Sequence, residues 1–315
     1  MAWSENDIPD LSDRVAVVTG GNGGLGLATT RALAAAGATV VMAARNLDKA
    51  ERARTEALTD HPDARIEIVE LDLASLASVE RAATEIVDRH PTIDILVNNA
   101  GVMGIPERTT ADGFEMQFGT NHLGHWALTA RLLPAILRAD AARVVTVTST
   151  AHHFGRPVDP ANPHLHGSYG EWKAYGQSKL ANYYFGLGLQ RRFEAAGVTA
   201  QSLIAHPGLS DTELQAVSVD ETGGGSSQKF FHWMAGTTGM SAEQGARSQL
   251  RAACDPSAEG GEFYGPLFVN NGPPVRKPVL RCFGMDTAID KLWEVSERET
   301  GVRLDVSEAL ENLRR

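Results

Sequence analysis

The amino-acid sequence predicts an α/β protein with a Rossmann-type, doubly wound parallel sheet and helices on both faces of that sheet. Short, nearly continuous apolar runs alternate with alanine-rich stretches of helical length, as expected of βαβ units whose strands are buried on both sides. A glycine-rich segment follows the first apolar run directly and leads into the first helical stretch. The 315 residues contain neither an internal repeat nor a linker, so we expect a single domain over residues 1–315.

Six strands are expected in the first two thirds of the chain, at the apolar runs 14–19, 39–43, 65–70, 93–97, 143–148 and 199–205. Helices are expected between them and after them, at the alanine-rich stretches 25–36, 47–58, 76–90, 121–139 and 175–196. A further short run at 262–266 and a last helix near 288–298 close the chain.

Two long segments interrupt this alternation. Residues 152–172 are rich in Pro, Gly and His, which makes them too polar for a core and typical of an insertion. Residues 215–240 combine a glycine-rich stretch with the aromatic residues Phe230, Phe231 and Trp233. Long connections in compact α/β proteins are often binding loops, so we expect 215–240 to be a substrate lid. The alternatives are surface disorder, or aromatic side chains docked permanently on the protein or on a second subunit.

The composition is that of a soluble globular protein, with 43% hydrophobic and 22% charged residues. A formal net charge of −10 argues against nucleic acid and against an anionic membrane surface as partners. No apolar stretch reaches the roughly 20 residues of a membrane-spanning helix. The first residues carry acids rather than the bases of a signal peptide, and Cys254 and Cys282 do not form a metal-type pair. We therefore expect a cytoplasmic protein with free thiols.

The glycine-rich segment runs from Thr19 to Gly26, between the first strand and the first helix. Glycines let the backbone turn sharply and approach a pyrophosphate, which the N-terminus of the helix stabilises. This placement predicts a dinucleotide site, with a merely structural turn as the alternative. The glycines fit two spacings, because either Gly23 or Gly24 can stand between Gly20 and Gly26.

The end of the second strand indicates which dinucleotide binds. NAD sites generally place an acidic residue there to hold the ribose hydroxyls, whereas this strand ends in Ala44 and Arg45. A guanidinium binds a 2′-phosphate that an acid would repel. We therefore predict NADP(H) in preference to NAD(H); the alternative is that Arg45 is only a solvated surface cation.

Three further features follow in order along the chain: Asn98-Asn-Ala-Gly101, then Ser149, then Tyr175-Gly-Gln-Ser-Lys179. In this combination the chain resembles the short-chain dehydrogenase/reductase family over roughly residues 10 to 270. The surroundings of His122, His125 and the run His206-Pro-Gly208 resemble the retinol-dehydrogenase-like branch and its bacterial relatives.

The resemblance implies hydride transfer between NADP(H) and the carbonyl or alcohol group of an apolar small-molecule substrate. It implies a catalytic group of Asn121, Ser149, Tyr175 and Lys179, in which Asn121 anchors a water that relays protons to Lys179. The cofactor-binding residues that we predict are Thr19, Gly20, Asn22, Gly24, Leu25, Gly26, Arg45, Asp72, Leu73, Asn98, Ala100, Tyr175, Lys179, Pro207, Gly208 and Thr212.

The chemistry explains these residue types independently. A free tyrosine has a pKa of about 10 and is a poor acid or base at neutral pH. Lys179 lies one helical turn after Tyr175, and its charge together with that of oxidised nicotinamide favours the phenolate. Ser149, at the end of a strand, can hold the substrate oxygen. Tyr169 and Lys173 have the same spacing, but Tyr169 lies in the insertion, so we expect Tyr175 to be the catalytic residue.

Two other function classes remain as alternatives. A sugar-nucleotide epimerase or dehydratase uses a similar tyrosine and lysine, and a non-catalytic NADP(H)-sensing regulator uses the same fold. We expect no metal site, because no carboxylate–histidine motif accompanies the histidines, and no hydrolase, because Ser149 is not in a nucleophile elbow. The identity of the substrate, the direction of reaction in the cell and the oligomeric state, monomer or homodimer, stay open.

Overall fold

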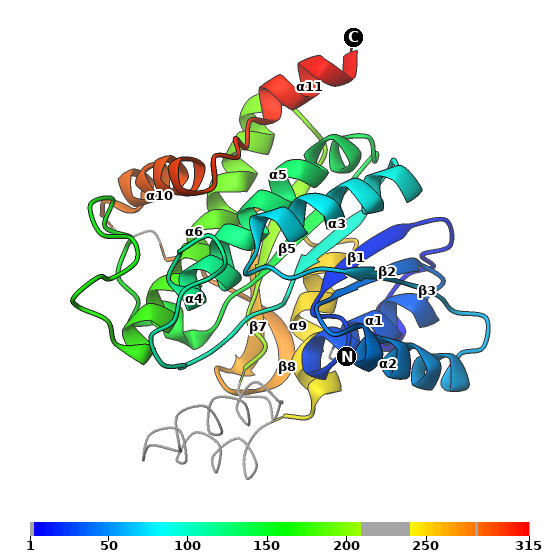
Figure 1. Ribbon diagram of the computed structural model, residues 1–315. Coiled ribbons are helices and arrows are strands. Elements are labelled where there is room, and N and C mark those ends of the chain that lie inside the picture. Colours follow the sequence, from blue (N-terminus) through cyan, green and yellow to red (C-terminus); the bar gives the residue numbers. More distant parts are fainter. Residues whose placement is uncertain (1–2, 209–239, 281–282, 315) are drawn as a thin grey trace.

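One eight-stranded sheet forms the centre of the protein in the computed structural model, which describes residues 3–208, 240–280 and 283–314 (Figure 1). The strand order is β3-β2-β1-β4-β5-β6-β7-β8, and every pairing is parallel except that of β7 with β8. The strands are β1 (Val15–Thr19), β2 (Thr39–Ala44), β3 (Arg65–Glu70), β4 (Ile95–Asn98), β5 (Arg143–Val147), β6 (Gln201–Ala205), β7 (Phe263–Phe268) and β8 (Asn271–Lys277). The doubly wound fold class predicted from the sequence is confirmed.

Helices cover both faces of the sheet (Figure 1). On one face lie α1 (Gly24–Ala35), α2 (Leu47–Asp60) and α9 (Ala242–Cys254), and on the other lie α3 (Leu76–Arg89), α5 (Gly124–Leu137) and α6 (Glu171–Ala196). The C-terminal helices are α10 (Met285–Thr300) and α11 (Val306–Arg314). Shorter elements are η1 (Glu5–Asp7), α4 (Met116–Phe118), the π-helical turn η2 (Gly119–Leu123) and η3 (Thr150–His153).

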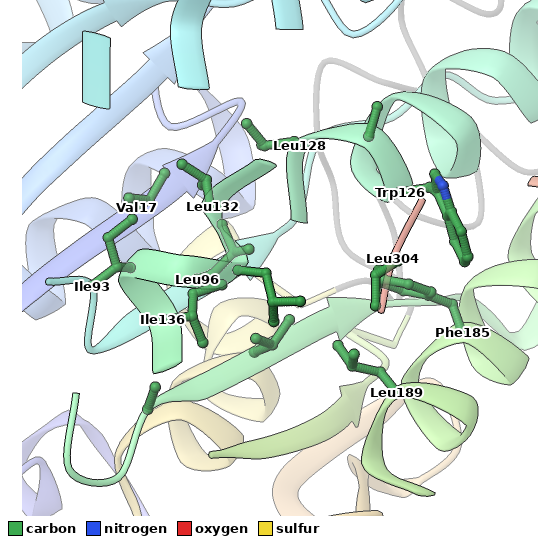
Figure 2. Close-up of a cluster of buried hydrophobic side chains, with 14 of the residues drawn as sticks. Val17, Ile93, Leu96, Trp126, Leu128, Leu132, Ile136, Phe185, Leu189 and Leu304 are labelled. Carbon is green, nitrogen blue, oxygen red and sulfur yellow. The ribbon is translucent and has the colours of Figure 1, made fainter. Parts of the chain in front are cut away.

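Successive residues of each strand enter opposite cores, because side chains alternate across a sheet. In β1, Val17 packs with the α3–α5–α6 layer, while its neighbours Ala16 and Val18 pack with the α1–α2–α9 layer. Figure 2 shows the first of these cores, in which Trp126 and Phe185 lie beside aliphatic side chains. Burying each such large side chain is worth roughly 1.5–3 kcal/mol, which explains why the strand sequences are apolar on both faces.

The C-terminal helices pack on α5 and α6. The indole of Trp126 on α5 donates a hydrogen bond to the backbone oxygen of Val302 at 2.8 Å. His122 lies 2.8 Å from the hydroxyl of Ser296 on α10. The guanidinium of Arg192 on α6 lies 3.7 Å from the ring centroid of Trp293. Polar and aromatic contacts therefore join α10 and the following Val302 to η2, α5 and α6.

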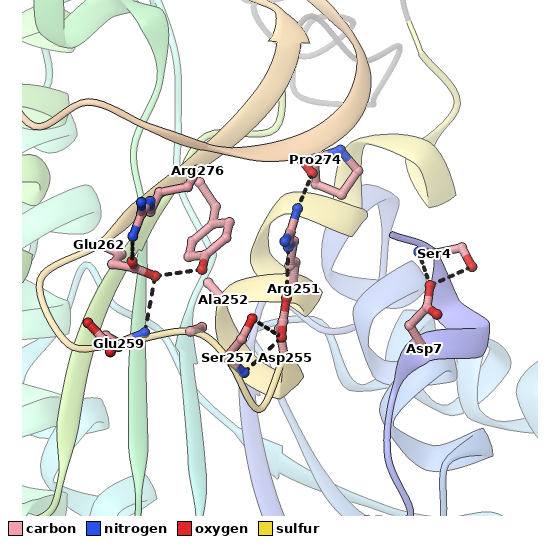
Figure 3. A network of polar contacts seen from close by, with 12 residues as sticks. Ser4, Asp7, Arg251, Ala252, Asp255, Ser257, Glu259, Glu262, Pro274 and Arg276 are labelled. Carbon is pink, nitrogen blue, oxygen red and sulfur yellow. Dashed lines mark hydrogen bonds and ion pairs between the residues drawn. The ribbon is translucent and has the colours of Figure 1, made fainter. Parts of the chain in front are cut away.

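Strand β8 is an element that the sequence did not predict. In the sheet that the structure describes, it runs antiparallel to its neighbour β7. Pro273 and Pro274 lie within it, and proline is tolerated there because β8 is an edge strand. Figure 3 shows how side chains attach it: Arg276 pairs with Glu262 at 2.6 Å, and Arg251 of α9 donates to the backbone oxygen of Pro274 at 2.7 Å. Helices α9 and α11 are also additions to the predicted elements.

The insertion at 152–172 is less polar in its packing than its composition suggested. Val158 and Leu165 are buried, and Val158 joins an apolar cluster with Phe118 of α4. The buried side chain of His164 lies 3.0 Å from the carboxylate of Glu299 on α10. This insertion is therefore anchored to the body of the protein. The predicted lid at 215–240 and Thr212 lie outside the described residues, apart from Met240.

Candidate functional site

The strand order reverses between β1 and β4, and the ends of these two strands form one wall of a cleft of about 420 Å³. Open α/β sheets bind their ligands at such a switch point, where the loops after neighbouring strands diverge. The cleft is lined by Gly20, Asn22, Gly23, Gly24, Leu25, Gly26, Ala43, Ala44, Arg45, Asn46, Lys49, Leu71, Asp72, Leu73, Asn99, Ala100, Gly101, Val102, Met103, Ile105 and Thr120. Nine of the predicted cofactor-binding residues are in this set: Gly20, Asn22, Gly24, Leu25, Gly26, Arg45, Asp72, Leu73 and Ala100.

The glycine-rich turn has the geometry that a phosphate-binding loop needs. Gly20 has a φ of +64°, a left-handed conformation that other residues rarely adopt. A Cβ atom on Gly26 would lie 2.1 Å from the backbone oxygen of Gly20, so only glycine lets α1 begin this close to β1. The N-terminus of α1 therefore opens directly onto the cleft, where its amides and dipole fit a pyrophosphate.

The part of the cleft beside the end of β2 is lined by two cationic residues, and no acidic residue ends that strand. Ala43 and Ala44 end the strand, and Arg45, Asn46 and Lys49 follow along the cleft wall. The side chain of Asn46 accepts a hydrogen bond from the Lys49 amide at 2.8 Å and so caps α2. Arg45 is exposed and forms no ion pair or side-chain hydrogen bond with any other residue that the structure describes. The residues present therefore fit a phosphorylated ribose.

Thr19 and Asn98 do not line the cleft. Thr19 is fully buried, and its hydroxyl accepts hydrogen bonds from the amides of Asn99 at 2.9 Å and Ala100 at 3.0 Å. The buried Asn98 side chain donates to the hydroxyl of Thr129 at 3.0 Å, whereas its neighbour Asn99 lines the cleft. Both residues thus support the cleft wall without lining the cleft. A direct contact of the Asn98 side chain with the cofactor does not fit this placement.

Pro207 and Gly208 follow the end of β6, at the same edge of the sheet as the cleft. Gly208 has a φ of +79°, and its amide donates to Nδ1 of His206 at 3.1 Å. The other ring nitrogen of His206 donates to the backbone oxygen of Val269 at 2.9 Å. Because both nitrogens of this buried imidazole have partners, His206 fixes the turn at Pro207 and Gly208.

Ser149, Tyr175 and Lys179 come together from the end of β5 and from α6. Ser149 caps the short helix η3, and its side chain forms a hydrogen bond with the side chain of Tyr175. The Lys179 ammonium lies 5.8 Å from the centroid of the Tyr175 ring and donates to the backbone oxygen of Val147 at 3.4 Å. A Cβ atom on Gly101 would lie 3.5 Å from this ammonium, which places the group beside the cleft.

Burial dominates the electrostatics of this pair. It raises the pKa of the Tyr175 phenol to about 12, although the hydrogen bond with Ser149 acts in the opposite direction. Burial also lowers the pKa of the Lys179 ammonium to about 8. Both shifts follow from removing a charged form from water. The protein by itself therefore holds Tyr175 as a neutral phenol, which can donate a proton.

Asn121, in the π-helical turn η2, connects the cleft with the tyrosine helix. Its Oδ1 accepts from the amide of Val102 at 2.7 Å, and its Nδ2 donates to the backbone oxygen of Val102 at 2.9 Å. Nδ2 also donates to the hydroxyl of Ser178 at 2.9 Å, which in turn donates to the backbone oxygen of Tyr175 at 2.8 Å. The side chain of Asn121 thus ties the loop after β4 to α6.

Tyr169, which shares the spacing of Tyr175, lies two residues before α6 and has a different environment. Its hydroxyl donates to the backbone oxygen of Ile105 at 2.7 Å and accepts from Nε2 of Gln117 at 3.1 Å. Burial raises the pKa of Tyr169 to about 12. This phenol joins the insertion to the loop after β4 through a saturated set of hydrogen bonds.

Sequence reasoning missed several residues around the cleft. Asn99, Gly101, Val102 and Met103 continue the wall that we predicted from Ala100. Lys49 lies in the first turn of α2, four residues after Arg45, and its positive charge close to Arg45 in the sequence could have identified it. Across the described ranges no group of three His, Cys, Asp or Glu residues is arranged to hold a metal ion. Nor does any helix there combine the length and the apolar character needed to cross a bilayer.

Comparisons with known proteins place the chain in a family. The model of the short chain dehydrogenase family matches residues 14–222. Retinol dehydrogenase 14 of Mus musculus is 34% identical over 306 residues, which are 93% of this chain and 87% of that protein. Polyprenol dehydrogenase of Mus musculus is 41% identical over 260 residues, 80% of this chain and 75% of that protein.

A crystal structure of an uncharacterised protein from Mycobacterium paratuberculosis has a TM-score of 0.78 and 39% identity, and the match covers 96% of this chain and 99% of that one. These matches confirm the resemblance predicted from Asn98-Asn-Ala-Gly101, Ser149 and the pair Tyr175 and Lys179. The chain belongs to the short-chain dehydrogenase family of NAD(P)-dependent oxidoreductases.

Proposed function

We propose that the protein transfers hydride between NADP(H) and the carbonyl or alcohol group of an apolar substrate, with Tyr175 as the acid and base. The observation that carries this proposal is the position of Gly101. This residue lines the cleft, and a Cβ atom there would lie 2.9 Å from Oδ1 of Asn121 and 3.5 Å from Nζ of Lys179. The cofactor cleft and the group formed by Ser149, Tyr175 and Lys179 are therefore parts of one site.

In this proposal Ser149 and Tyr175 hold the substrate oxygen between their hydroxyl groups. When bound, reduced nicotinamide would supply the hydride, and Tyr175 would donate its proton to the oxygen on which negative charge builds. Lys179 stabilises the phenolate that remains, because its ammonium lies one turn away on the same helix. The neutral phenol of the free protein suits reduction of a carbonyl, and the reverse reaction requires a cationic cofactor to bring the tyrosine pKa down.

The preference for NADP(H) rests on Arg45, with Lys49 as a second cation on the same wall. A guanidinium without an ion-pair partner can form two parallel hydrogen bonds with a 2′-phosphate. An acid that would hold the two ribose hydroxyls of NAD is missing from the end of β2, where Ala43 and Ala44 stand. We expect Gly20, Asn22, Leu25 and Gly26 to hold the pyrophosphate.

An apolar substrate agrees with the lining beyond the glycine-rich turn, where Val102, Met103 and Ile105 lie. Two of the relatives are named for retinol and polyprenol, which are long apolar alcohols. The substrate lid at 215–240, the contact of Thr212 with the cofactor, the single-domain organisation and a cytoplasmic location stay predictions that accompany this proposal.

The test is turnover of purified protein followed by the absorbance of reduced nicotinamide. NADPH and NADH are each offered with short polar and long apolar aldehydes, and NADP and NAD with the corresponding alcohols. We expect NADPH with a long apolar aldehyde to give the highest kcat/KM. Tight NADPH binding without turnover of any carbonyl would favour the regulator, and turnover of a nucleotide sugar alone would favour the epimerase.

A further inference from the structure

A buried histidine outside the predicted catalytic group joins the two halves of the site. His125, near the start of α5, is 1% exposed. Its Nδ1 lies 2.9 Å from the backbone oxygen of Asn121, and its Nε2 lies 2.8 Å from the hydroxyl of Thr19. Asn121 belongs to the catalytic side, whereas Thr19 ends β1 below the glycine-rich turn. One imidazole therefore spans the distance between them.

The contacts of His125 fix the position of its proton. A backbone oxygen can only accept, so Nδ1 carries the hydrogen and donates it to Asn121. The hydroxyl of Thr19 accepts two amide hydrogens, from Asn99 and Ala100. Its oxygen lies 2.8 Å from Nε2 but 3.3 Å from the backbone oxygen of Val97, so its own proton is directed to the nearer acceptor, Nε2. Burial lowers the pKa of His125 to about 4, and the nearby charge of Lys179 acts in the same direction. The ring is therefore neutral, with one donor and one acceptor.

These bonds form a continuous series in which every donor points the same way. The amides of Asn99 and Ala100 donate to Thr19, Thr19 donates to His125, and His125 donates to the oxygen of Asn121. Hydrogen bonds in such a series polarise and strengthen one another in a low-dielectric interior. The series begins at the wall of the cofactor cleft and ends at the residue whose side chain holds Val102 and Ser178.

We propose that His125 is a positioning residue, which holds the Asn121 backbone so that the Asn121 side chain keeps the loop after β4 and the tyrosine helix in register. The proposal rests on the proposed function, because it assigns a role in turnover by Tyr175. In this role His125 touches neither cofactor nor substrate and acts through Asn121 alone. The hydrogen bond that Nδ1 of His125 donates to the backbone oxygen of Asn121 is the essential contact. The hydrogen bond that Nε2 accepts from Thr19 orients the ring.

Two substitutions that introduce amide side chains separate the contact with Asn121 from the contact with Thr19. The amide nitrogen introduced by His125→Asn takes approximately the place of Nδ1 and can still donate to Asn121, but it loses Thr19. The longer amide introduced by His125→Gln reaches the place of Nε2 and can accept from Thr19, but it loses Asn121. His125→Phe keeps a ring and loses both. His122→Phe is the matched control, since His122 is equally buried in the preceding turn but contacts Ser296 of α10.

We expect His125→Gln and His125→Phe to lower kcat about tenfold, with the Kd for NADPH within about threefold of the wild type. His125→Asn should stay within about threefold in kcat, as should His122→Phe. Equal losses in all three His125 variants, or a loss confined to NADPH affinity, would overturn the positioning role. Should Tyr175→Phe leave turnover intact, the proposed function fails, whatever the His125 series gives.

Two measurements test the proposal without turnover. Nitrogen NMR of imidazole-labelled wild-type protein should show a protonated Nδ1 and an unprotonated Nε2 on His125. The amide of Val102, which donates to Asn121, should exchange its hydrogen faster in His125→Gln than in His125→Asn. A proton on Nε2 in the wild type, or equal exchange in the two variants, would contradict the series of bonds described above.

Discussion

The Lys179 ammonium lies 5.8 Å from the centre of the Tyr175 ring, one turn along α6, and contacts the backbone oxygen of Val147 at 3.4 Å. At this separation the lysine acts on the tyrosine through its charge, since no hydrogen bond joins the two groups in the structure. Burial raises the pKa of Tyr175 and lowers that of Lys179, so the two groups are tuned toward a neutral phenol and a titratable amine. If the proposed function holds, we expect turnover to depend on both side chains.

Tyr175→Phe should reduce kcat by several orders of magnitude while leaving NADPH affinity nearly intact. The substitution keeps the ring and removes only the hydroxyl that donates the proton. Tyr169→Phe is the control, because it removes a phenol at the same spacing from a lysine. It should reduce stability by about 1 kcal/mol through the lost bond to Ile105, with little change in kcat. Turnover kinetics and thermal unfolding of both variants decide between the two tyrosines.

Arg45→Ala should weaken NADPH binding at least tenfold and NADH binding by less than about threefold, because only NADPH carries the 2′-phosphate. Lys49→Ala should have the same selectivity with a smaller effect, as a second cation on the cleft wall. Arg52→Ala provides the control, since Arg52 is exposed on α2 but does not line the cleft. Kd values from fluorescence titration check this prediction, and an equal loss for both cofactors would contradict it.

Gly26→Ala should destabilise the protein by roughly 1–3 kcal/mol and weaken both cofactors alike. The new methyl group would meet the backbone oxygen of Gly20 at 2.1 Å, and neither backbone segment can move away cheaply. Gly170→Ala, where the nearest atom would be Cβ of Lys173 at 3.5 Å, should cost less than about 1 kcal/mol. Denaturant unfolding of the two variants measures the difference. Similar losses would mean that close packing at Gly26 is unimportant.

Glu115 should make the protein less stable as pH rises. The buried carboxylate accepts the amides of Gln117 at 2.8 Å and Phe118 at 2.6 Å, yet burial outweighs these bonds and raises its pKa to about 7. An acid whose pKa is higher in the folded state contributes stability below its unfolded pKa, and this contribution is lost as pH rises through about 7.

Glu115→Gln should therefore flatten the change in Tm between about pH 4.5 and pH 7, whatever its effect on the absolute Tm. Thermal unfolding of both proteins across this range is the measurement. The same slope in both would show that Glu115 titrates in its ordinary range.

The sequence predicted the strands well because each is a short, nearly pure apolar run. The run 65–70 coincides with β3, and the predicted second strand ends one residue before β2 does. Strand β8 could not be predicted in this way, since Asn271, Gly272 and two prolines are typical of a loop and become a strand only through pairing with β7. Tertiary pairing, not local propensity, creates that element.

The residues of the candidate site likewise fall into those that the sequence could identify and those that it could not. Residues with distinctive chemistry, such as Tyr175 and Arg45, could be identified because their roles follow from type and spacing. His125 could not, because a histidine in a helix has no spacing rule that connects it with Thr19, 106 residues earlier. Asn98 shows a different limit of sequence-based prediction. Neighbouring residues of one short motif point in opposite directions, and the sequence alone does not say which of Asn98 and Asn99 faces the cleft.

The docking of α10 and α11 on α5 and α6 has a consequence for how the protein is made. Trp126 and His122 find their buried hydrogen-bond partners in Val302 and Ser296, which follow them by 176 and 174 residues. During translation these two side chains emerge long before their partners do, so α5 and α6 cannot reach their final packing until residues 296–302 have been synthesised. A nascent or truncated chain would expose an aromatic surface over α5 and α6, and it would be the form of the protein most prone to aggregation and proteolysis.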